Sequence, residues 1–145
     1  MIMMISTRGR YALRVMIDLA EQNTSRFVSL KEIAARQEIS EKYLESIVKA
    51  LVQGGCLEGM RGKSGGYRLV RSPEEYTVGS ILRLTEGSLA PVACLEPRAG
   101  SCNREENCRT LPMWRKLYAL IDDFFDGIPL SELIASGQSG DEYTI

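Results

Sequence analysis

The 145-residue chain has no histidine, and it has no long apolar run. Without histidine there can be no Ser-His-Asp or Cys-His nucleophile pair, no histidine-ligated haem and no histidine-ligated zinc, so we do not expect an enzyme. No apolar stretch approaches the roughly 18 residues of a membrane span. Polar residues interrupt positions 1–12, so we expect neither a signal peptide nor export, and predict a cytoplasmic protein.

The composition is that of an ordinary globular domain with four cysteines. Hydrophobic residues make up 44% of the chain and charged residues 26%, which argues against disorder or a fibrous structure. In the cytoplasm, cysteines are more often reduced, ligating or redox-active than paired in structural disulfides. We therefore expect the cysteines to be free thiols that bind a ligand, undergo redox chemistry or pack in the core, and not to form structural disulfides.

Charge is distributed unevenly along the chain. Residues 1–72 hold 12 Lys and Arg against 7 Asp and Glu, a balance of +5, whereas residues 73–145 hold 6 against 12, a balance of −6. A basic half on an acidic chain is typical of a local nucleic-acid-binding face, although a solvated basic surface would look the same.

The first half predicts three helices. Ser6 or Thr7 caps a helix over 9–22, with Leu13, Met16, Ile17 and Ala20 on its apolar face. Ser29 and Glu32 form a capping box for a second helix that ends near Gln37.

Ser40 caps the third helix, which ends at Gly54. Its apolar residues are Leu44, Ile47, Val48 and Leu51, and its opposite side presents Glu41, Lys42, Tyr43, Glu45, Ser46 and Lys49. Two short helices joined by a short turn predict a helix-turn-helix, whose second helix reads the major groove.

A β-hairpin is predicted directly after these helices. Residues 56–60 can pair with residues 67–70 across a glycine-rich basic tip that contains Arg61, Gly62 and Lys63. Such a tip can carry Arg61 and Lys63 into a minor groove, where the negative potential is strong. The two elements together predict a winged helix that binds double-stranded DNA.

Three segments resemble the Rrf family of bacterial transcription regulators: residues 5–12, residues 40–45 and residues 61–67. The resemblance extends over about residues 3–136. It implies a homodimeric winged-helix repressor with its third helix in the major groove of a palindromic operator. It also implies DNA contacts by Ser40, Lys42, Tyr43, Glu45, Ser46 and Arg61, and phosphate contacts by Ser6, Thr7 and Arg8.

The second half predicts a linker helix and a long helix. Thr77 caps a helix over 78–86, and Pro112 opens a helix that runs to Asp126. The long helix carries an apolar stripe of Trp114, Leu117, Leu120, Ile121, Phe124 and Phe125. A small winged domain cannot cover so much apolar surface, so we predict a homodimer seam, with intrachain packing as the alternative.

A polar loop between these helices contains Cys94, Cys102 and Cys108 in a C-x7-C-x5-C spacing. Thiolates suit iron–sulfur clusters or zinc, and a shared ligand explains the three cysteines better than packing does. Cys56 stands where the first hairpin strand begins, and we expect it to be a small core residue.

Cluster-binding members of the resembled family place three cysteines in this same loop, which implies a [2Fe–2S] or [4Fe–4S] cluster. Some of them have a histidine where Leu111 stands, and another has an aspartate where Arg10 stands. The fourth ligand therefore stays open between a water, a small thiol and an oxygen of Glu96, Glu105 or Glu106. The cysteines could also form a redox switch without metal.

We predict a mainly α fold with a small β-hairpin wing: a winged helix-turn-helix over 1–76, a linker helix, cysteine loop and dimerisation helix over 77–136, and a flexible tail over 137–145. A regulator tuned by an iron–sulfur cluster is the preferred function. A cluster-free regulator of cysteine metabolism, sensing a small molecule, a partner enzyme or thiol oxidation, is the alternative. An electron-transfer protein would leave the basic wing unexplained.

Overall fold

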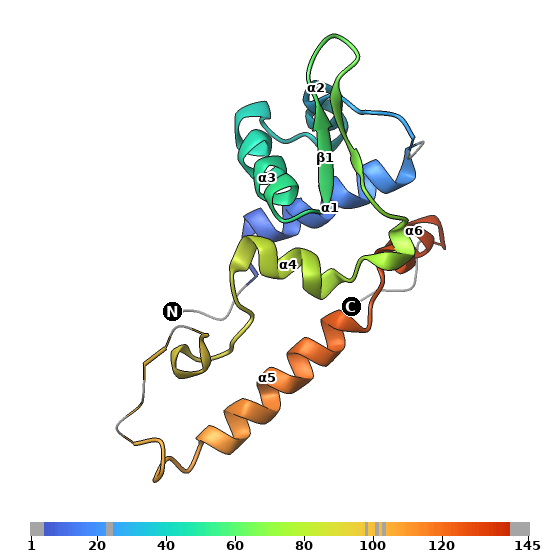
Figure 1. The fold of residues 1–145 in the computed structure, drawn as a ribbon. Helices are drawn as coiled ribbons and strands as arrows, with labels where there is room; N and C mark the ends of the chain where they lie inside the picture. The colour runs from blue at the N-terminus through green and yellow to red at the C-terminus, as the bar shows by residue number, and fades with distance from the viewer. Residues whose placement is uncertain (1–4, 23–24, 98, 101, 103, 140–145) are drawn as a thin grey trace.

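The computed structural model describes residues 5–22, 25–97, 99–100, 102 and 104–139. The elements in chain order are α1 (Thr7–Glu21), α2 (Leu30–Gln37), α3 (Glu41–Gln53), β1 (Leu57–Met60), β2 (Gly66–Leu69), η1 (Pro73–Glu75), α4 (Val78–Glu86), η2 (Ala93–Leu95), α5 (Leu111–Asp126) and α6 (Leu130–Ser139). Figure 1 shows a head of helices and hairpin at one end and α5 projecting from the other. The predicted winged-helix architecture is confirmed.

The helix starts follow local side-chain chemistry. The hydroxyl oxygens of Ser6, Ser29 and Ser40 each accept a hydrogen bond from a backbone amide in the first turn, and Thr77 caps α4 in the same way. Each cap satisfies an amide that the helix itself cannot pair. The first helix begins two residues before the predicted start, and Ser6, one of the two predicted caps, is the residue that caps it.

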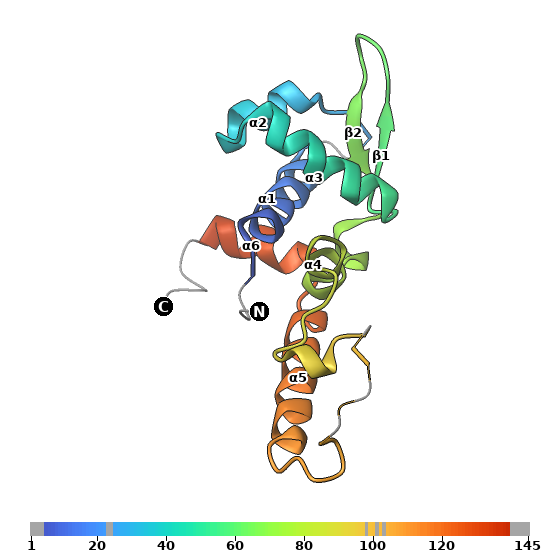
Figure 2. The ribbon, with the colours of Figure 1, turned by 90° about the vertical axis from the view of Figure 1, so that its left-hand side faces the viewer.

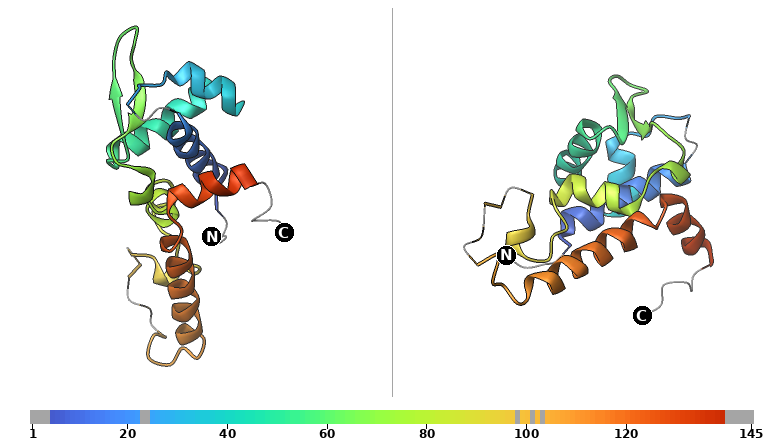
Figure 3. Two further views of the ribbon diagram at one scale, coloured as in Figure 1. Left: turned by 90° about the vertical axis from the view of Figure 1, so that its right-hand side faces the viewer. Right: turned by 60° about the horizontal axis from the view of Figure 1, so that its bottom comes forward.

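The apolar face predicted for α1 is only partly correct. Ala12, Val15, Met16 and Leu19 are the residues that are buried, whereas Leu13, Ile17 and Ala20 are half-buried at the margins of the core. The face is shifted because α1 is contacted from several sides. It packs against α2, α3 and β2, and also against α4 and α6, as Figure 3 shows.

The wing is a two-stranded antiparallel hairpin in the register Leu57↔Leu69 to Met60↔Gly66. Its base is fixed to the segment before α2, because the amide of Val28 donates to the Tyr67 carbonyl at 2.9 Å and the amide of Tyr67 donates to the Val28 carbonyl at 2.8 Å. Gly66 has a φ of +148°, and a Cβ there would collide with the Val28 carbonyl. Glycine is therefore required where the two backbones meet.

Tyr76 joins the wing to the rest of the head. Its ring is buried, and its hydroxyl donates to the Cys56 carbonyl at 2.7 Å and accepts from the amides of Val70 and Arg71. Leu130 at the start of α6 lies in the same core. Residues after the wing therefore belong to the same hydrophobic core as the helices before it. The predicted domain boundary after residue 76 stays a prediction.

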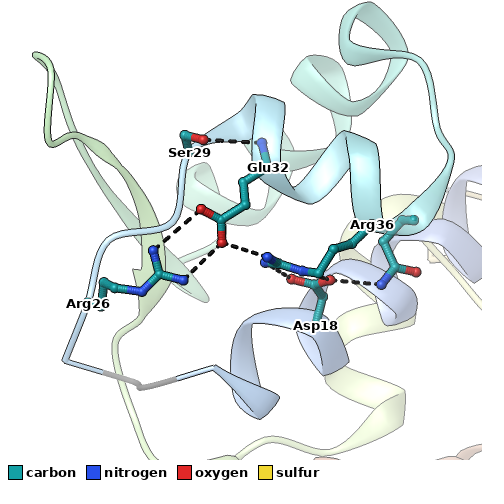
Figure 4. Close-up of polar contacts among 6 residues, drawn as sticks. Asp18, Arg26, Ser29, Glu32 and Arg36 are labelled. Atoms are coloured by element: carbon teal, nitrogen blue, oxygen red, sulfur yellow. Dashed lines mark hydrogen bonds and ion pairs between the residues drawn. The ribbon is translucent and has the colours of Figure 1, made fainter.

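A polar network ties α1 to α2 (Figure 4). The Asp18 carboxylate is 2% exposed and accepts two hydrogen bonds from the Arg36 guanidinium, at 2.8 and 3.0 Å, and one from the Gln37 amide at 2.8 Å. Hydrogen bonds from Arg26 and Arg36 lower the pKa of Glu32 to about 2, so this carboxylate is ionised at any physiological pH.

A second, smaller core lies between the head and α5. Val78, Leu82 and Leu89 are its buried residues, and Ile121 and Phe125 of α5 pack against them from one side. Arg83 of α4 is paired with Asp122 and Asp126 of α5, each at 2.8 Å. These contacts fix α5 to α4.

Two predicted features of the C-terminal half need comment. The helix α6 was not predicted, and it reaches Ser139, inside the segment 137–145 that we expected to be flexible; residues 140–145 lie outside the described residues. None of the helices in the described part of the chain is both long and apolar enough to cross a membrane.

Candidate nucleic-acid interface and cysteine pocket

The outer face of α3 combines exposed and half-buried side chains. Lys42, Glu45 and Lys49 are exposed, together with the cap residue Ser40. Tyr43 is half-buried, with its ring 5.8 Å from that of Tyr11 in an edge-to-face contact. The exposed residues form a row that a neighbouring molecule can reach.

Ser46 connects α3 to the start of α1. Its hydroxyl donates to the Tyr43 carbonyl at 2.9 Å and accepts from the Arg8 guanidinium at 3.1 Å, and Arg8 also donates to the Ser46 carbonyl. Both residues were predicted to contact DNA, and both are half-buried in contacts within the chain. Arg8 and Ser46 are therefore less accessible to a partner than the exposed residues of the row.

The other two N-terminal residues predicted to contact phosphate differ in exposure. Thr7 is exposed, and its hydroxyl accepts from Arg10 at 3.0 Å. Ser6 is half-buried, and both its amide and its hydroxyl donate to the Glu86 carboxylate at 2.8 Å. The start of α1 is thus bonded to α4 through Ser6 and to α3 through Arg8.

The wing tip carries the exposed cations of the hairpin. Arg61, Gly62 and Lys63 are all exposed, and Gly62 has a φ of +110°. The other two basic residues of this segment are engaged: Arg68 pairs with Glu58 at 2.5 Å, and the Arg71 guanidinium lies 4.6 Å from the centre of the Tyr76 ring. The positive charge available to a partner is therefore concentrated at the tip.

A groove of about 750 Å³ runs between α3 and the wing. The charged residues Glu45, Lys49 and Arg61 line it. The N-terminal turn of α2 also reaches it, through Ser29 and Leu30, which were not predicted to lie at the DNA-binding face. Figure 2 shows α3 and the hairpin side by side at one end of the molecule. The shape and charges suit a phosphate-rich polymer.

The three loop cysteines line one small cavity of about 70 Å³. Cys94 and Cys102 are exposed, Cys108 is half-buried, and none of the three is in a disulfide. The cavity is also lined by Leu95, Gly100, Glu105, Leu111 and Arg115. Among the described residues, no three Cys, Asp or Glu side chains stand close enough to hold a metal ion without movement of the loop.

The chemistry of the thiols differs between the cavity and the core. A hydrogen bond from Thr110 lowers the pKa of the Cys108 thiol, assisted by the Leu111 amide and the charge of Arg104. This favours the thiolate, which is the form that binds metals. Burial raises the pKa of the Cys56 thiol, which lies in the main core as predicted.

The apolar stripe of α5 is divided between two surroundings. Ile121 and Phe125 pack against α4, whereas Leu120 is 61% exposed and Phe124 is 62% exposed. Met113 is also exposed, at 53%. The alternative, in which the whole stripe packs within one chain, is therefore wrong for this outer part, and the homodimer seam stays a prediction.

Comparison with known proteins gives one consistent result. The model of the Rrf2 family, described as an iron-dependent transcriptional regulator, matches residues 5–136. The transcriptional regulator CymR of Bacillus subtilis is 36% identical over 140 residues, which cover 97% of this chain and 95% of CymR. The transcriptional regulator IscR of Aliivibrio salmonicida is 35% identical over 136 residues, covering 94% of this chain and 80% of IscR.

Solved structures agree with these relatives. IscR of T. potens superposes with a TM-score of 0.74 at 31% identity, covering 98% of this chain and 93% of that one. CymR of B. subtilis, described as the global cysteine regulator, has a TM-score of 0.72 at 34% identity, covering 91% and 96%. An oxidised form of Staphylococcus aureus CymR has a TM-score of 0.70 at 32% identity, covering 98% of each chain.

Proposed function

The chain belongs to the Rrf2 family of transcriptional regulators, and on that premise we propose that it is a homodimeric repressor whose operator binding is tuned by an iron–sulfur cluster held by Cys94, Cys102 and Cys108. Its relatives are named as regulators of transcription, so the protein is a regulator and not an enzyme. The three thiols that line one cavity carry the proposal of a cluster.

The residues around the cavity fit a thiolate-bound cluster. Three soft donors are present, and Arg115 lines the same cavity as a cation that offsets their negative charge. Hydrogen bonds from Thr110, assisted by the Leu111 amide and the charge of Arg104, lower the pKa of the Cys108 thiol and so favour its thiolate. A bound cluster would supply a group whose presence depends on iron, oxygen or nitric oxide, which is the chemistry of a sensor.

DNA binding is assigned to the row of α3 and to the wing tip. Lys42, Lys49, Arg61 and Lys63 are exposed on this side, so they can contact phosphates, and Glu45 between them can accept a hydrogen bond from a base edge. In the dimer, two copies of α3 would reach successive major grooves.

The contacts at the start of α1 suggest how the loop influences DNA binding. Leu89, at the beginning of the cysteine loop, shares the smaller core with Ile5. Ser6 is bonded to Glu86, and Arg8 is bonded to Ser46 of α3. We expect the loop to have two positions, with ligated and with free thiols, that shift α1 and through it α3.

Replacing Cys102 with alanine should abolish the visible absorbance of anaerobically reconstituted protein, because the proposed cluster loses one of three thiolate ligands. Cys56→Ala is the matched control and should retain the absorbance, since Cys56 lies in the main core. Absorption spectra with iron and sulfide analysis make the measurement. Full absorbance in Cys102→Ala would show that the ligand assignment is wrong.

Lys42→Ala should weaken binding to duplex DNA of any sequence and reduce the slope of log K against log salt by about one, because one phosphate contact is lost. Fluorescence anisotropy at several salt concentrations measures this slope. Lys116→Ala is the control, since Lys116 is exposed and belongs to α5, the helix that projects away from the wing (Figure 1). An unchanged slope in Lys42→Ala would exclude the phosphate contact.

A cluster-free regulator of cysteine metabolism is the second candidate. The similarity to CymR over nearly the whole chain favours it, and the free thiols of the loop could respond to oxidation directly. Iron and sulfide analysis of protein purified without air distinguishes the two candidates. Stoichiometric iron and sulfide support the cluster, and their absence supports the thiol-based regulator.

A further inference from the structure

We propose that the Glu105 carboxylate is the fourth protein ligand of the iron–sulfur cluster held by the three loop cysteines. This inference rests on the proposed function and deepens it, because it names the residue that completes the site. The sequence leaves the fourth ligand open between a water, a small thiol and an oxygen of Glu96, Glu105 or Glu106, and the structure distinguishes among the three glutamates.

Glu105 is placed with the thiols and the other two glutamates are not. Its side chain lines the cavity formed by Cys94, Cys102 and Cys108. Within the described part of the chain, neither Glu96 nor Glu106 is among the residues that line it. One oxygen donor therefore shares a cavity with three sulfur donors.

The local backbone explains this placement. The Glu105 amide donates to the Cys102 carbonyl at 3.1 Å, and the Asn107 amide donates to the Arg104 carbonyl at 3.0 Å. These two successive turns fold the segment between the second and third cysteines back on itself. Glu105 is consequently kept near Cys102, and any closure of the loop around a ligand would carry both residues together.

The side chain is held loosely enough to change partner. Its carboxylate lies 3.4 Å from the Arg115 guanidinium, and the two side chains are 54% and 57% exposed. Such an exposed ion pair contributes little stability. Arg115 lines the same cavity and would stay close as a counter-charge to four anionic donors.

The choice of donor also has a chemical consequence. The chain contains no histidine, so no imidazole of its own can complete the site. A carboxylate oxygen is a harder donor than a thiolate and binds iron less strongly in a sulfur-rich site. The iron atom bound to Glu105 would therefore be the one at which a small molecule exchanges most readily.

The test compares four variants after anaerobic reconstitution with iron and sulfide: Glu105→Ala, Glu105→Gln, Glu105→Cys and Glu106→Gln. The readouts are visible absorption and circular dichroism, Mössbauer spectra of ⁵⁷Fe-labelled protein and the lifetime of the absorbance in air. Far-UV circular dichroism checks that each variant is folded. Glu106 is the matched control, an exposed glutamate adjacent in the same loop.

We expect Glu105→Ala and Glu105→Gln to alter the spectra and to shorten the lifetime by about tenfold, the scale of effect that the surroundings of a metal site commonly have. Glu105→Cys should give an all-thiolate Mössbauer signature and a longer lifetime. Glu106→Gln should match the wild type.

Two results would overturn the assignment while leaving the cluster itself in place. One is that the spectra and lifetimes of Glu105→Ala and Glu105→Gln coincide with those of the wild type. The other is that Glu106→Gln changes them equally, which would indicate a general effect of charge. A wild-type protein that takes up no iron would overturn both this inference and the proposed cluster.

Discussion

Asp18→Ala is expected to lower the free energy of unfolding by about 2 kcal/mol, because a buried carboxylate loses its three hydrogen bonds, two of them to the Arg36 guanidinium. Asp18 is 2% exposed and accepts three hydrogen bonds, and it joins the helix that supports the core to the helix that precedes the DNA-facing helix (Figure 4). Urea unfolding at fixed protein concentration measures the change as a shift in midpoint with unchanged slope.

Glu32→Ala is the control for this network. Glu32 pairs with Arg26 and Arg36, but its side chain is 35% exposed, so water replaces most of what is lost. A cost below about 1 kcal/mol is expected. If Asp18→Ala lowers the free energy of unfolding no more than Glu32→Ala does, the burial of Asp18 does not strengthen its contacts. That result would contradict the prediction.

Replacing both Leu120 and Phe124 of α5 with aspartate should convert a dimer into a monomer and weaken operator binding by about 100-fold or more. The two side chains are 61% and 62% exposed, and Met113 and Leu117 continue the same stripe at spacings of three and four residues. This is the spacing of a helix–helix seam, in which a buried carboxylate is costly. A monomer presents one recognition helix and loses the gain from binding two half-sites together.

Ala119→Asp supplies the matched control. Ala119 is exposed and lies about a third of a turn around α5 from the Leu120–Phe124 stripe, so the added charge should leave the dimer intact. Sedimentation measures the mass, and a footprint on the operator measures binding. A wild-type protein that is monomeric at micromolar concentration, or a double variant that stays dimeric, would contradict the predicted seam.

The features that sequence reasoning predicted well are those set by neighbours in the chain. The caps at Ser29, Ser40 and Thr77 depend on residues within a few positions and are found where they were expected, although the Glu32 side chain pairs with arginines and does not complete the predicted capping box. The hairpin strands span 57–60 and 66–69, within one residue of the predicted 56–60 and 67–70. The three loop cysteines line one cavity, and a shared ligand for them stays a prediction.

What the sequence did not predict depends on contacts between distant segments. Ser6 and Arg8 are residue types that often contact phosphate. Only the fold shows that Ser6 also forms hydrogen bonds to Glu86, and that Arg8 forms hydrogen bonds to Ser46. Glu105 lines the cysteine cavity, and Glu106 is not among the residues that line it. This difference accompanies two backbone turns, which no pattern of side chains in the sequence indicates. The one signal that was available for Asp18 was a charge between Val15 and Leu19 on an apolar helix face.

The ion pairs of Arg83 with Asp122 and Asp126 join α5 to the head near one end of the helix, so the rest of α5 extends away from this junction. The helix has 16 residues and is therefore about 24 Å long. A tilt of about 10° at this junction moves the far end of α5, which would carry the dimer contact, by about 4 Å relative to the head, close to the 3.4 Å step between base pairs. A small angular change at two salt bridges would thus suffice to bring the paired reading helices into or out of phase with the double helix.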